Sequence, residues 1–249
     1  MTRIFALTLL LALFGYGGAQ SAECDPFAVA VATDPVPNQY PRGLEKAHTL
    51  LDHVPRMADV VLVGDSLVAN WPEDMARRQF KSDRIWNFAV GGSVSQNTLW
   101  QLGKLKATGL EPAQVVVLVG TNNLTRDDMP ACAIAAGIKA VVMAAHQKWP
   151  GAKLHVMGIP PRGMDFHFRD TVRLAINSEV EAWTKGFAYQ HYFEVDASAV
   201  TCGQYDRPVQ AVSAAARRLP TCANYADDFG HFKRAGYDVV FSAMMKASR

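Results

Sequence analysis

Five short apolar runs, separated by stretches of helical length, dominate the hydrophobic pattern of this chain. The runs are rich in aliphatic residues and cover residues 59–63, 85–90, 115–119, 153–159 and 191–196. The pattern around them predicts helices over residues 44–53, 67–80, 96–108, 131–149, 170–185 and 233–247. Buried β-type runs that alternate with helices are typical of a parallel sheet covered on both faces. With right-handed crossovers, the sequence therefore predicts an α/β fold, a three-layer α/β/α sandwich of the doubly wound kind.

Residues 197–227 interrupt this alternation. The segment contains two cysteines and two prolines and has no clear hydrophobic period. Segments of this length without secondary structure are usually functional or held by a tether. We expect the two cysteines to supply the tether.

The first residues have the pattern of an export signal. Arg3 precedes an apolar run over 4–14, and small residues follow it. This run of eleven residues is shorter than the about 20 that span a bilayer. We predict a signal peptide over 1–22 and a single domain over 23–249 that is secreted or periplasmic and not inserted in a membrane. An uncleaved anchor and a buried first helix are the alternatives.

Composition and charge limit the class of protein. Of the 249 residues, 49% are hydrophobic and 19% are charged, which is the profile of a globular protein. Loss of residues 1–22 removes one Arg and no acid, so the formal net charge falls from +2 to +1. This balance gives no reason to expect a nucleic acid or an anionic membrane as partner.

The four cysteines, Cys24, Cys132, Cys202 and Cys222, all lie beyond the predicted signal. An even number in an exported chain predicts two disulfides, with three possible pairings. Sequence spacing favours Cys202–Cys222 together with Cys24–Cys132. There is no Cys-x-x-Cys motif, and the seven histidines show no paired-ligand spacing. We therefore expect no metal and no other cofactor.

Ser66 is the first candidate for chemistry, because it follows the first predicted strand in the sequence Gly64-Asp65-Ser66. Functional groups of a parallel α/β sheet gather at the carboxyl ends of its strands. The start of a helix also offers free N–H groups and a positive potential that stabilise an oxyanion. Ser66 is therefore a candidate nucleophile, and a plain N-cap is the alternative.

A serine nucleophile needs a base, and the base needs an orienting group. The sequence Asp227-Asp228-Phe229-Gly230-His231 supplies both near the C-terminus. Asp228 stands three residues before His231 and can reach its Nδ1 while Nε2 faces the nucleophile. These two residues are therefore the candidate acid/base pair, and a solvated loop with a helix cap is the alternative.

Two further strand ends carry unusual residues. Gly91 and Gly92 follow the second predicted strand, and Asn122 follows the third. The N–H groups of Ser66 and Gly92, together with the side-chain amide of Asn122, are sufficient for an oxyanion hole. Each motif alone can be an ordinary turn. Their joint occurrence at strand ends favours a catalytic site.

In this order and spacing, Ser66, Gly92, Asn122 and His231 resemble the conserved blocks of the SGNH (GDSL-like) hydrolase superfamily, which is named for these four residue types. Residues 120–123 and 160–163 extend the likeness to the catalytic subunits of platelet-activating-factor acetylhydrolase and to related bacterial esterases. The resemblance implies a flavodoxin-like sheet of five parallel strands. It also implies hydrolysis of an ester through an acyl-serine, without a metal.

Three residues depart from the usual pattern of that family. Ser93 and Asn123 stand where many members have Asp, and Phe232 stands where Leu is usual. None of them removes a catalytic group. We therefore expect them to affect which substrate is bound and not the type of reaction. The loop over 162–169, after the fourth predicted strand, is expected to line the pocket and help set specificity, with a solvated charged loop as the alternative.

The favoured function is a serine esterase for short-chain, mainly acetyl, esters, with a small ester or an acylated carbohydrate as substrate. An O-acyltransferase that acts on glycans and a lysophospholipase-type esterase stay open, because both use the same residues. An α/β-hydrolase is excluded, since no Gly-x-Ser-x-Gly pentapeptide occurs. A non-catalytic glycan-binding protein is disfavoured, because Ser66, Asp228 and His231 are all present. The natural ester and the oligomeric state are left open.

Overall fold

Five parallel strands form the centre of the protein. The computed structural model describes residues 24–106, 109–207 and 222–248, so the predicted signal peptide over 1–22 lies outside the described residues. The strands are β1 (Val60–Gly64), β2 (Ile85–Asn87), β3 (Gln114–Leu118), β4 (Lys153–Met157) and β5 (Gln190–Phe193). They pair in parallel in the order β2-β1-β3-β4-β5. This is the flavodoxin-like order, and the predicted fold class is confirmed.

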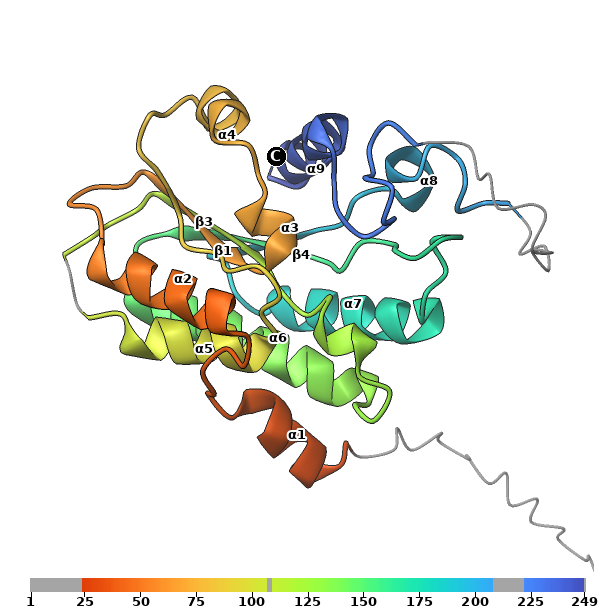
Figure 1. Ribbon diagram of the computed structural model, residues 1–249, viewed down its shortest axis with the longest axis horizontal. Helices are drawn as coiled ribbons and strands as arrows, with labels where there is room; N and C mark the ends of the chain where they lie inside the picture. The colour runs from red at the N-terminus through yellow and green to blue at the C-terminus, as the bar shows by residue number, and fades with distance from the viewer. Residues whose placement is uncertain (1–23, 107–108, 208–221, 249) are drawn as a thin grey trace, which may run out of the picture.

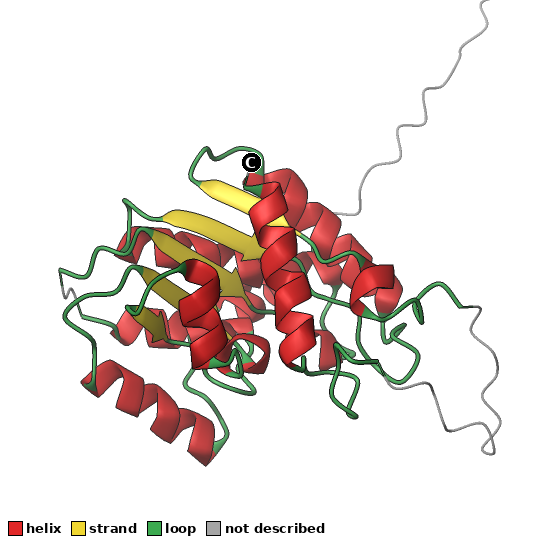
Figure 2. Cartoon of the chain, turned by 90° about the horizontal axis from the view of Figure 1, so that it is seen from above, coloured by secondary structure: helices red, strands yellow, loops and turns green. Residues whose placement is uncertain are grey.

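Helices cover both faces of the sheet, which gives three layers (Figure 1). One face is covered by α2 (Pro41–Asp52), α5 (Ser95–Lys104), α6 (Ala131–Lys148) and α7 (Asp170–Thr184), and α1 (Pro26–Thr33) packs on α6. The other face is covered by α3 (Ser66–Ala69), α4 (Glu73–Phe80), α8 (Ala197–Val200) and α9 (Arg234–Ala247). A short 3-10 helix, η1 (Asn123–Thr125), follows β3. Figure 2 shows the strands side by side between the helices.

The three inner strands, β1, β3 and β4, are buried on both faces, whereas the edge strands β2 and β5 are only partly buried. Successive side chains of a strand point to opposite sides of a sheet. In β1, Val61 and Val63 pack in the core beneath α5 and α6, whereas Val60 and Leu62 pack in the core beneath α3, α4 and α9. All five residues of β1 are buried. This double burial explains why the strands read as continuous apolar runs in the sequence.

The helix predicted over 67–80 is in fact two helices. Helix α3 ends at Ala69 and α4 begins at Glu73, with Pro72 as the N-cap of α4. Proline has no N–H to donate within a helix, and it disfavours the helical conformation of the residue before it. The apolar period continues across the break and so conceals it.

Other elements also differ from the sequence pattern. Helix α1 falls outside the predicted elements, although Asp25 caps it and Pro26 occupies its first position, as is usual at helix starts. The strand predicted over 85–90 ends at Asn87, whose side chain accepts a hydrogen bond from the N–H of Ala89. The regular strand therefore ends three residues before the apolar run does, although the N–H groups of Phe88 and Val90 still donate to the carbonyls of Leu62 and Gly64 in β1 at 2.8 and 3.1 Å.

The two predicted disulfides are present, and the pairing that the sequence spacing favours is confirmed. Cys24–Cys132 joins the chain before α1 to α6 across 108 residues, and Cys202–Cys222 joins residues 20 apart. No cysteine is free. In the described part of the chain, no helix combines the length and the apolar character needed to cross a membrane.

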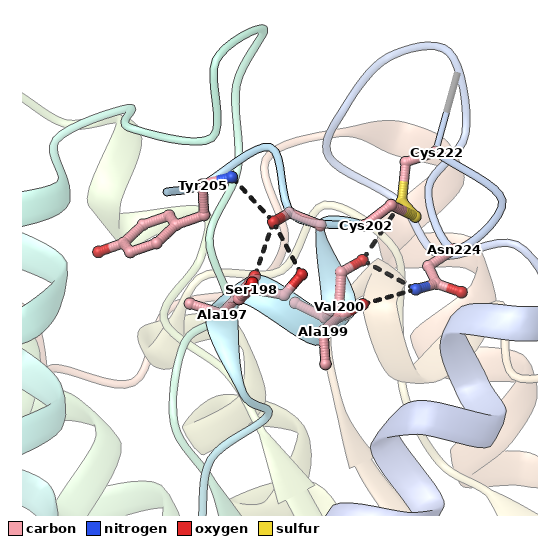
Figure 3. The surroundings of a disulfide bond; sticks show 9 residues. Ala197, Ser198, Ala199, Val200, Cys202, Tyr205, Cys222 and Asn224 are labelled. Carbon is pink, nitrogen blue, oxygen red and sulfur yellow. Dashed lines mark hydrogen bonds between the residues drawn. A yellow bond between two sulfur atoms is a disulfide. The ribbon is translucent and has the colours of Figure 1, made fainter. Parts of the chain in front are cut away.

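The irregular segment over 197–227 is fastened at both ends, as Figure 3 shows. The disulfide links Cys202, just after α8, to Cys222. Asn224 then donates its side-chain amide to the last carbonyls of α8, those of Ala199 and Val200, at 3.1 Å each. The cysteines therefore provide the expected tether, and the chain that follows residue 224 starts from a fixed point on α8.

We predict that the two disulfides contribute unequally to stability. In the chain-entropy model, the longer closed loop contributes about 5 kcal/mol and the shorter one about 3 kcal/mol. Replacing Cys24 and Cys132 by Ser should therefore lower the free energy of unfolding in urea more than the same replacement of Cys202 and Cys222. Thiol titration of the unfolded, unreduced wild type should find no free thiol. A free thiol, or the opposite order of the two double variants, would contradict this assignment.

Candidate active site

Ser66 is the first residue of α3, directly beyond the carboxyl end of β1. Gly64 makes this sharp turn possible, because its φ is +153° and a Cβ there would lie 1.9 Å from the carbonyl oxygen of Leu118 in β3. Asp65 then caps α3 by accepting the N–H of Leu67 at 3.0 Å. The turn therefore presents Ser66 at the edge where the strands end.

His231 and Asp228 reach Ser66 from the other end of the chain. The Nε2 atom of His231 lies 2.9 Å from Oγ of Ser66, and its Nδ1 atom lies 2.6 Å from Oδ2 of Asp228. A carboxylate beside Nδ1 favours the tautomer that carries its proton there, which leaves Nε2 free to accept the serine proton. The structure thus brings together the three residues that the sequence singled out, in a continuous chain of hydrogen bonds.

A tight turn over residues 225–232 holds the acid/base pair in position. Tyr225 and Phe232 form an antiparallel bridge, and the N–H of Ala226 donates to the carbonyl of His231 at 2.8 Å. The Tyr225 hydroxyl donates to the carbonyl of Pro161 at 2.6 Å, which anchors the turn to the loop after β4. The position of His231 is therefore set by the backbone of the turn and not only by its own side-chain contacts.

The two adjacent acids of this turn differ sharply. Oδ1 of Asp228 accepts the N–H groups of Gly230 at 2.9 Å and of His231 at 3.0 Å. Partial burial acts to raise the pKa of Asp228, but the hydrogen bonds from the His231 ring and these two N–H groups outweigh it and hold the pKa below its usual value. The side chain of Asp227 is 92% exposed and pairs with Lys233 at 3.2 Å. Only Asp228 is placed to orient the imidazole.

The expected oxyanion hole has three N–H donors: the backbone N–H of Ser66 at the start of α3, the backbone N–H of Gly92, and the side-chain amide of Asn122. Among the described residues, no hydrogen bond engages the backbone N–H of Ser66 or of Gly92. A Cβ on the neighbouring Gly91 would lie 3.8 Å from Cβ of Ser66, so this loop runs beside the serine. Asn122 donates one amide hydrogen to the carbonyl of Ser93 at 2.9 Å, which ties its loop to the same place. Such an arrangement can bind a developing oxyanion.

The residues that depart from the usual family pattern have structural roles here. Ser93 is buried, and its hydroxyl accepts the side-chain amide of Asn38 at 3.4 Å. Asn123 is fully buried, accepts the N–H of Ser95 at 2.9 Å and donates to its hydroxyl at 3.2 Å. An ionised Asp at position 123 has no hydrogen to donate, and so it could not bind the side-chain oxygen of Gln96, to which Asn123 donates at 3.0 Å. Phe232 packs in the core beneath α9.

Sequence reasoning missed Asp65, which stands directly before the serine. Its side chain is fully buried, and within the described residues its Oδ2 has no hydrogen-bond partner. Burial raises the pKa of Asp65 to about 7, although the N–H of Leu67 and the positive charges of Arg162 and His231 lower it. Near neutral pH the carboxyl is therefore partly protonated, which limits the negative charge next to Ser66. Its position between a buried strand and a helix start was the signal that could have revealed it.

Arg162 brings the loop over 162–169 to the site. Its Nη1 donates to the carbonyl of Thr121 at 3.0 Å and to the hydroxyl of the same residue at 3.1 Å. Its Nη2 lies 3.6 Å from the place that a Cβ on Gly230 would occupy. Phe166 of the same loop is fully buried and cannot contact a substrate.

A groove of about 810 Å³ between β5, α7 and α9 is lined by residues such as Tyr192, Asp196 and Lys246, and it includes none of the residues discussed above. No group of three or more His, Cys, Asp or Glu side chains in the described ranges is arranged to hold a metal ion.

Comparison with known proteins connects this geometry to a family. The model of the GDSL-like lipase/acylhydrolase family matches residues 58–239, a range that includes Ser66 and His231. The chain is similar to the platelet-activating factor acetylhydrolase IB subunit alpha1 of Homo sapiens, with 32% identity over 139 residues, 55% of this chain and 59% of that protein. It is also similar to subunit alpha2 of Rattus norvegicus, with 35% identity over 115 residues, 46% of this chain and 49% of that protein. The chain thus spans about half to three fifths of the curated relatives that it matches.

Solved structures share the fold. A GDSL-like lipase from Bacteroides thetaiotaomicron superposes with a TM-score of 0.55 at 17% identity, over 84% of this chain and 96% of that one. The lipase/acylhydrolase from Enterococcus faecalis gives a TM-score of 0.54 at 16% identity, over 76% of this chain and 94% of that one. At this level of identity the likeness supports the architecture alone.

We predict that the two neighbouring acids respond very differently to the same substitution. Asp228→Asn should lower kcat by about 10³- to 10⁴-fold, because an amide beside Nδ1 enforces the wrong tautomer of His231. Asp227→Asn is the matched control and should have little effect, since its exposed ion pair is weak. The measurement is kcat and KM on one acetyl ester. A crippled Asp227→Asn with a nearly normal Asp228→Asn would contradict the assignment.

A second prediction concerns the buried Asp65 and the pH dependence of stability. Its folded pKa of about 7 lies above that of an unfolded Asp, about 3.9. The native state therefore binds the extra proton between about pH 4 and pH 7, and this residue lowers stability as the pH rises through that window. Asp65→Asn, which cannot titrate, should gain stability relative to the wild type by up to about 1.4 kcal/mol per pH unit.

Urea unfolding at pH 5 and pH 7 measures this effect, with Asp83→Asn as a control at an exposed acid. The Asp83→Asn protein should follow the pH dependence of the wild type. If Asp65→Asn follows it as well, the carboxyl of Asp65 is ionised throughout the range and the assignment is wrong.

Proposed function

This chain belongs to the GDSL-like lipase/acylhydrolase family, and from that premise we propose that it is a secreted or periplasmic serine esterase that removes short acyl groups, mainly acetyl, from a carbohydrate. Membership of the family makes the protein a hydrolase that acts on esters. One observation carries the proposed serine mechanism. The hydrogen-bonded chain runs from Ser66 Oγ to His231 Nε2 at 2.9 Å, and from His231 Nδ1 to Asp228 at 2.6 Å.

In the proposed reaction, Ser66 Oγ attacks the carbonyl carbon of the ester while Nε2 of His231 takes the hydroxyl proton. The N–H groups of Ser66 and Gly92 and the amide of Asn122 stabilise the tetrahedral oxyanion. The intermediate collapses, the C–O bond to the alcohol breaks, and His231 returns the proton to the leaving oxygen. A water molecule then gives a proton to His231 and attacks the acyl carbon. The C–Oγ bond breaks, His231 returns the proton to Ser66 Oγ, and the acid leaves. Asp228 stabilises the imidazolium in both halves.

The preference for a short acyl group is supported by the relatives. The names of the similar curated proteins describe the hydrolysis of an acetyl ester. Because this chain spans only part of their length, the preference is a proposal for this protein and not a transfer of their activity.

A carbohydrate substrate is supported by Tyr40, which is 69% exposed. Its ring lies 3.8 Å from the place that a Cβ on Gly92 would occupy, so the side chain stands at the rim of the proposed oxyanion hole. The backbone N–H of Tyr40 donates to Asn38 at 2.9 Å, and Asn38 in turn binds Ser93. A tyrosine fixed in this way offers an apolar face and a hydroxyl to a sugar ring. Tyr40 lies outside the range matched by the family model.

Export is supported by the two disulfides. Such bonds form and persist in oxidising compartments and are rare in the cytosol. They are compatible with a secreted or periplasmic protein. The predicted signal peptide over 1–22 implies the same location.

We predict that the protein without residues 1–22 hydrolyses 4-nitrophenyl acetate with a higher kcat/KM than the butyrate or octanoate ester, without added metal. Ser66→Ala should lower kcat by about 10⁴-fold or more, because the nucleophile is lost while the oxyanion donors remain. Acetate release from acetylated polysaccharide extracts should require Ser66 as well. Substantial activity in Ser66→Ala, or activity that EDTA abolishes and zinc restores, would contradict a serine mechanism.

A further inference from the structure

Arg162 stands next to the proposed catalytic residues with much of its guanidinium unused. Nη1 donates to the carbonyl and the hydroxyl of Thr121, the residue before Asn122. Nη2 lies beside Gly230, the residue before His231. The guanidinium therefore lies between the loop of Asn122 and the turn of His231. An arginine has five N–H donors, and within the described residues none on Nε or Nη2 of Arg162 has a partner.

No acid forms a salt bridge with Arg162 in the part of the chain that the structure describes; its charge lowers the pKa of the buried Asp65, but no ion pair joins the two. The salt bridges of this part pair other arginines with carboxylates, and none includes Arg162. Asp228 lies near Gly230 too, but its Oδ2 is bound to the His231 ring and its Oδ1 to two backbone N–H groups. The positive charge of Arg162 is thus available to a ligand.

The loop that carries Arg162 is held rigidly against the turn of His231. The N–H of Gly163 donates to the carbonyl of Phe229 at 2.9 Å, and the N–H of Phe168 donates back to the carbonyl of Arg162 at 3.1 Å. The guanidinium carbon lies 5.7 Å from the centre of the Phe168 ring, which is 39% exposed. Arg162 is therefore oriented in advance, so that little rotamer freedom is lost when a ligand binds.

A comparison with Arg173 shows what a purely structural arginine looks like in this chain. Arg173 is only 2% exposed. Its Nε donates to Asp170 at 2.7 Å, its Nη1 to the carbonyl of Ile159 at 3.1 Å, and its Nη2 to the Tyr205 hydroxyl at 3.3 Å. Every nitrogen of Arg173 is used and its charge is paired. Arg162 has neither property.

We propose that Arg162 forms a subsite for an anionic group, a carboxylate or a phosphate, that the ester substrate carries close to its scissile bond. A planar guanidinium matches both oxyanions with two parallel hydrogen bonds. The inference rests on the proposed esterase function and names a feature of its substrate: the acylated molecule is acidic, as in an acylated uronic acid or a glycerol phosphate.

The first test uses the wild type and two pairs of substrates that differ in charge. One pair is acetylated glucuronic acid and its methyl ester, and the other is acetylglycerol 3-phosphate and acetylglycerol. Acetate release gives kcat/KM for each. We expect the charged member of at least one pair to be preferred by about 10- to 100-fold, the usual value of hydrogen bonds to a charged group. The pair that shows the preference identifies the anion. No preference in either pair overturns the inference, whatever any variant does.

The second test assigns the preference to Arg162. Arg162→Met keeps the length of the side chain and removes its charge, and it should reduce the ratio of charged to neutral kcat/KM by at least about tenfold. Arg162→Lys should restore only part of the ratio, because an ammonium cannot form the paired bonds. Arg78→Met, which removes an exposed arginine of α4, should keep the ratio of the wild type. An unchanged ratio in Arg162→Met, with the same thermal unfolding temperature as the wild type, overturns the inference.

These outcomes are separate from those that test the esterase itself. Hydrolysis of the neutral esters that depends on Ser66 but shows no preference for charge would leave the proposed function intact and remove only the anionic subsite. Absence of any hydrolysis that depends on Ser66 would overturn the function as well.

Discussion

The whole site depends on one long-range constraint: a histidine near the C-terminus must stand within hydrogen-bonding distance of a serine 165 residues earlier in the sequence. Two contacts enforce it from opposite sides. The Tyr225 hydroxyl fixes the turn of His231 to the carbonyl of Pro161 at 2.6 Å. The Tyr237 hydroxyl fixes α9 to the carbonyl of Leu67, next to the serine, at 3.0 Å. The parallel sheet makes both possible, because its strands all end at the same edge.

Two carboxylates beside the serine and the histidine have opposite environments. Asp65 is fully buried, and burial raises its pKa to about 7. Asp228 is partly exposed and accepts three hydrogen bonds, which hold its pKa below the usual value against the effect of burial. One acid can therefore be neutral behind the nucleophile while the other carries the charge that a protonated His231 requires. Such a division of roles between paired acids is common in active sites.

The fold class and the residues of the candidate site could largely be predicted from the sequence, because local sequence patterns mark them. The five strands read as apolar runs, and Ser66, Asp228 and His231 occur in short motifs at the ends of elements. The break at Pro72 was missed because the apolar period continues across it. The loop over 162–169 was expected to line the pocket, but the sequence did not single out Arg162 within it, and it did not show that Asp65, next to the serine, is fully buried. The full burial of Asp65 and the contacts of Arg162 with two distant loops depend on the tertiary fold.

The same distinction applies to the substrate. The two residues proposed to contact it, Tyr40 and Arg162, come from the chain before β1 and from the loop after β4, and the fold brings them beside Gly92 and Gly230. In the proposed function, specificity therefore rests on contacts between loops, whereas the chemistry rests on motifs.

The most direct test of the central claim is covalent labelling with an alkyl fluorophosphonate, followed by peptide mass spectrometry. The reagent reacts with a serine only where a base and an oxyanion hole activate it. The account predicts one adduct, on Ser66, and its loss in His231→Ala although that variant keeps the serine. Labelling of another residue, or equal labelling of Ser66 in His231→Ala, would contradict it.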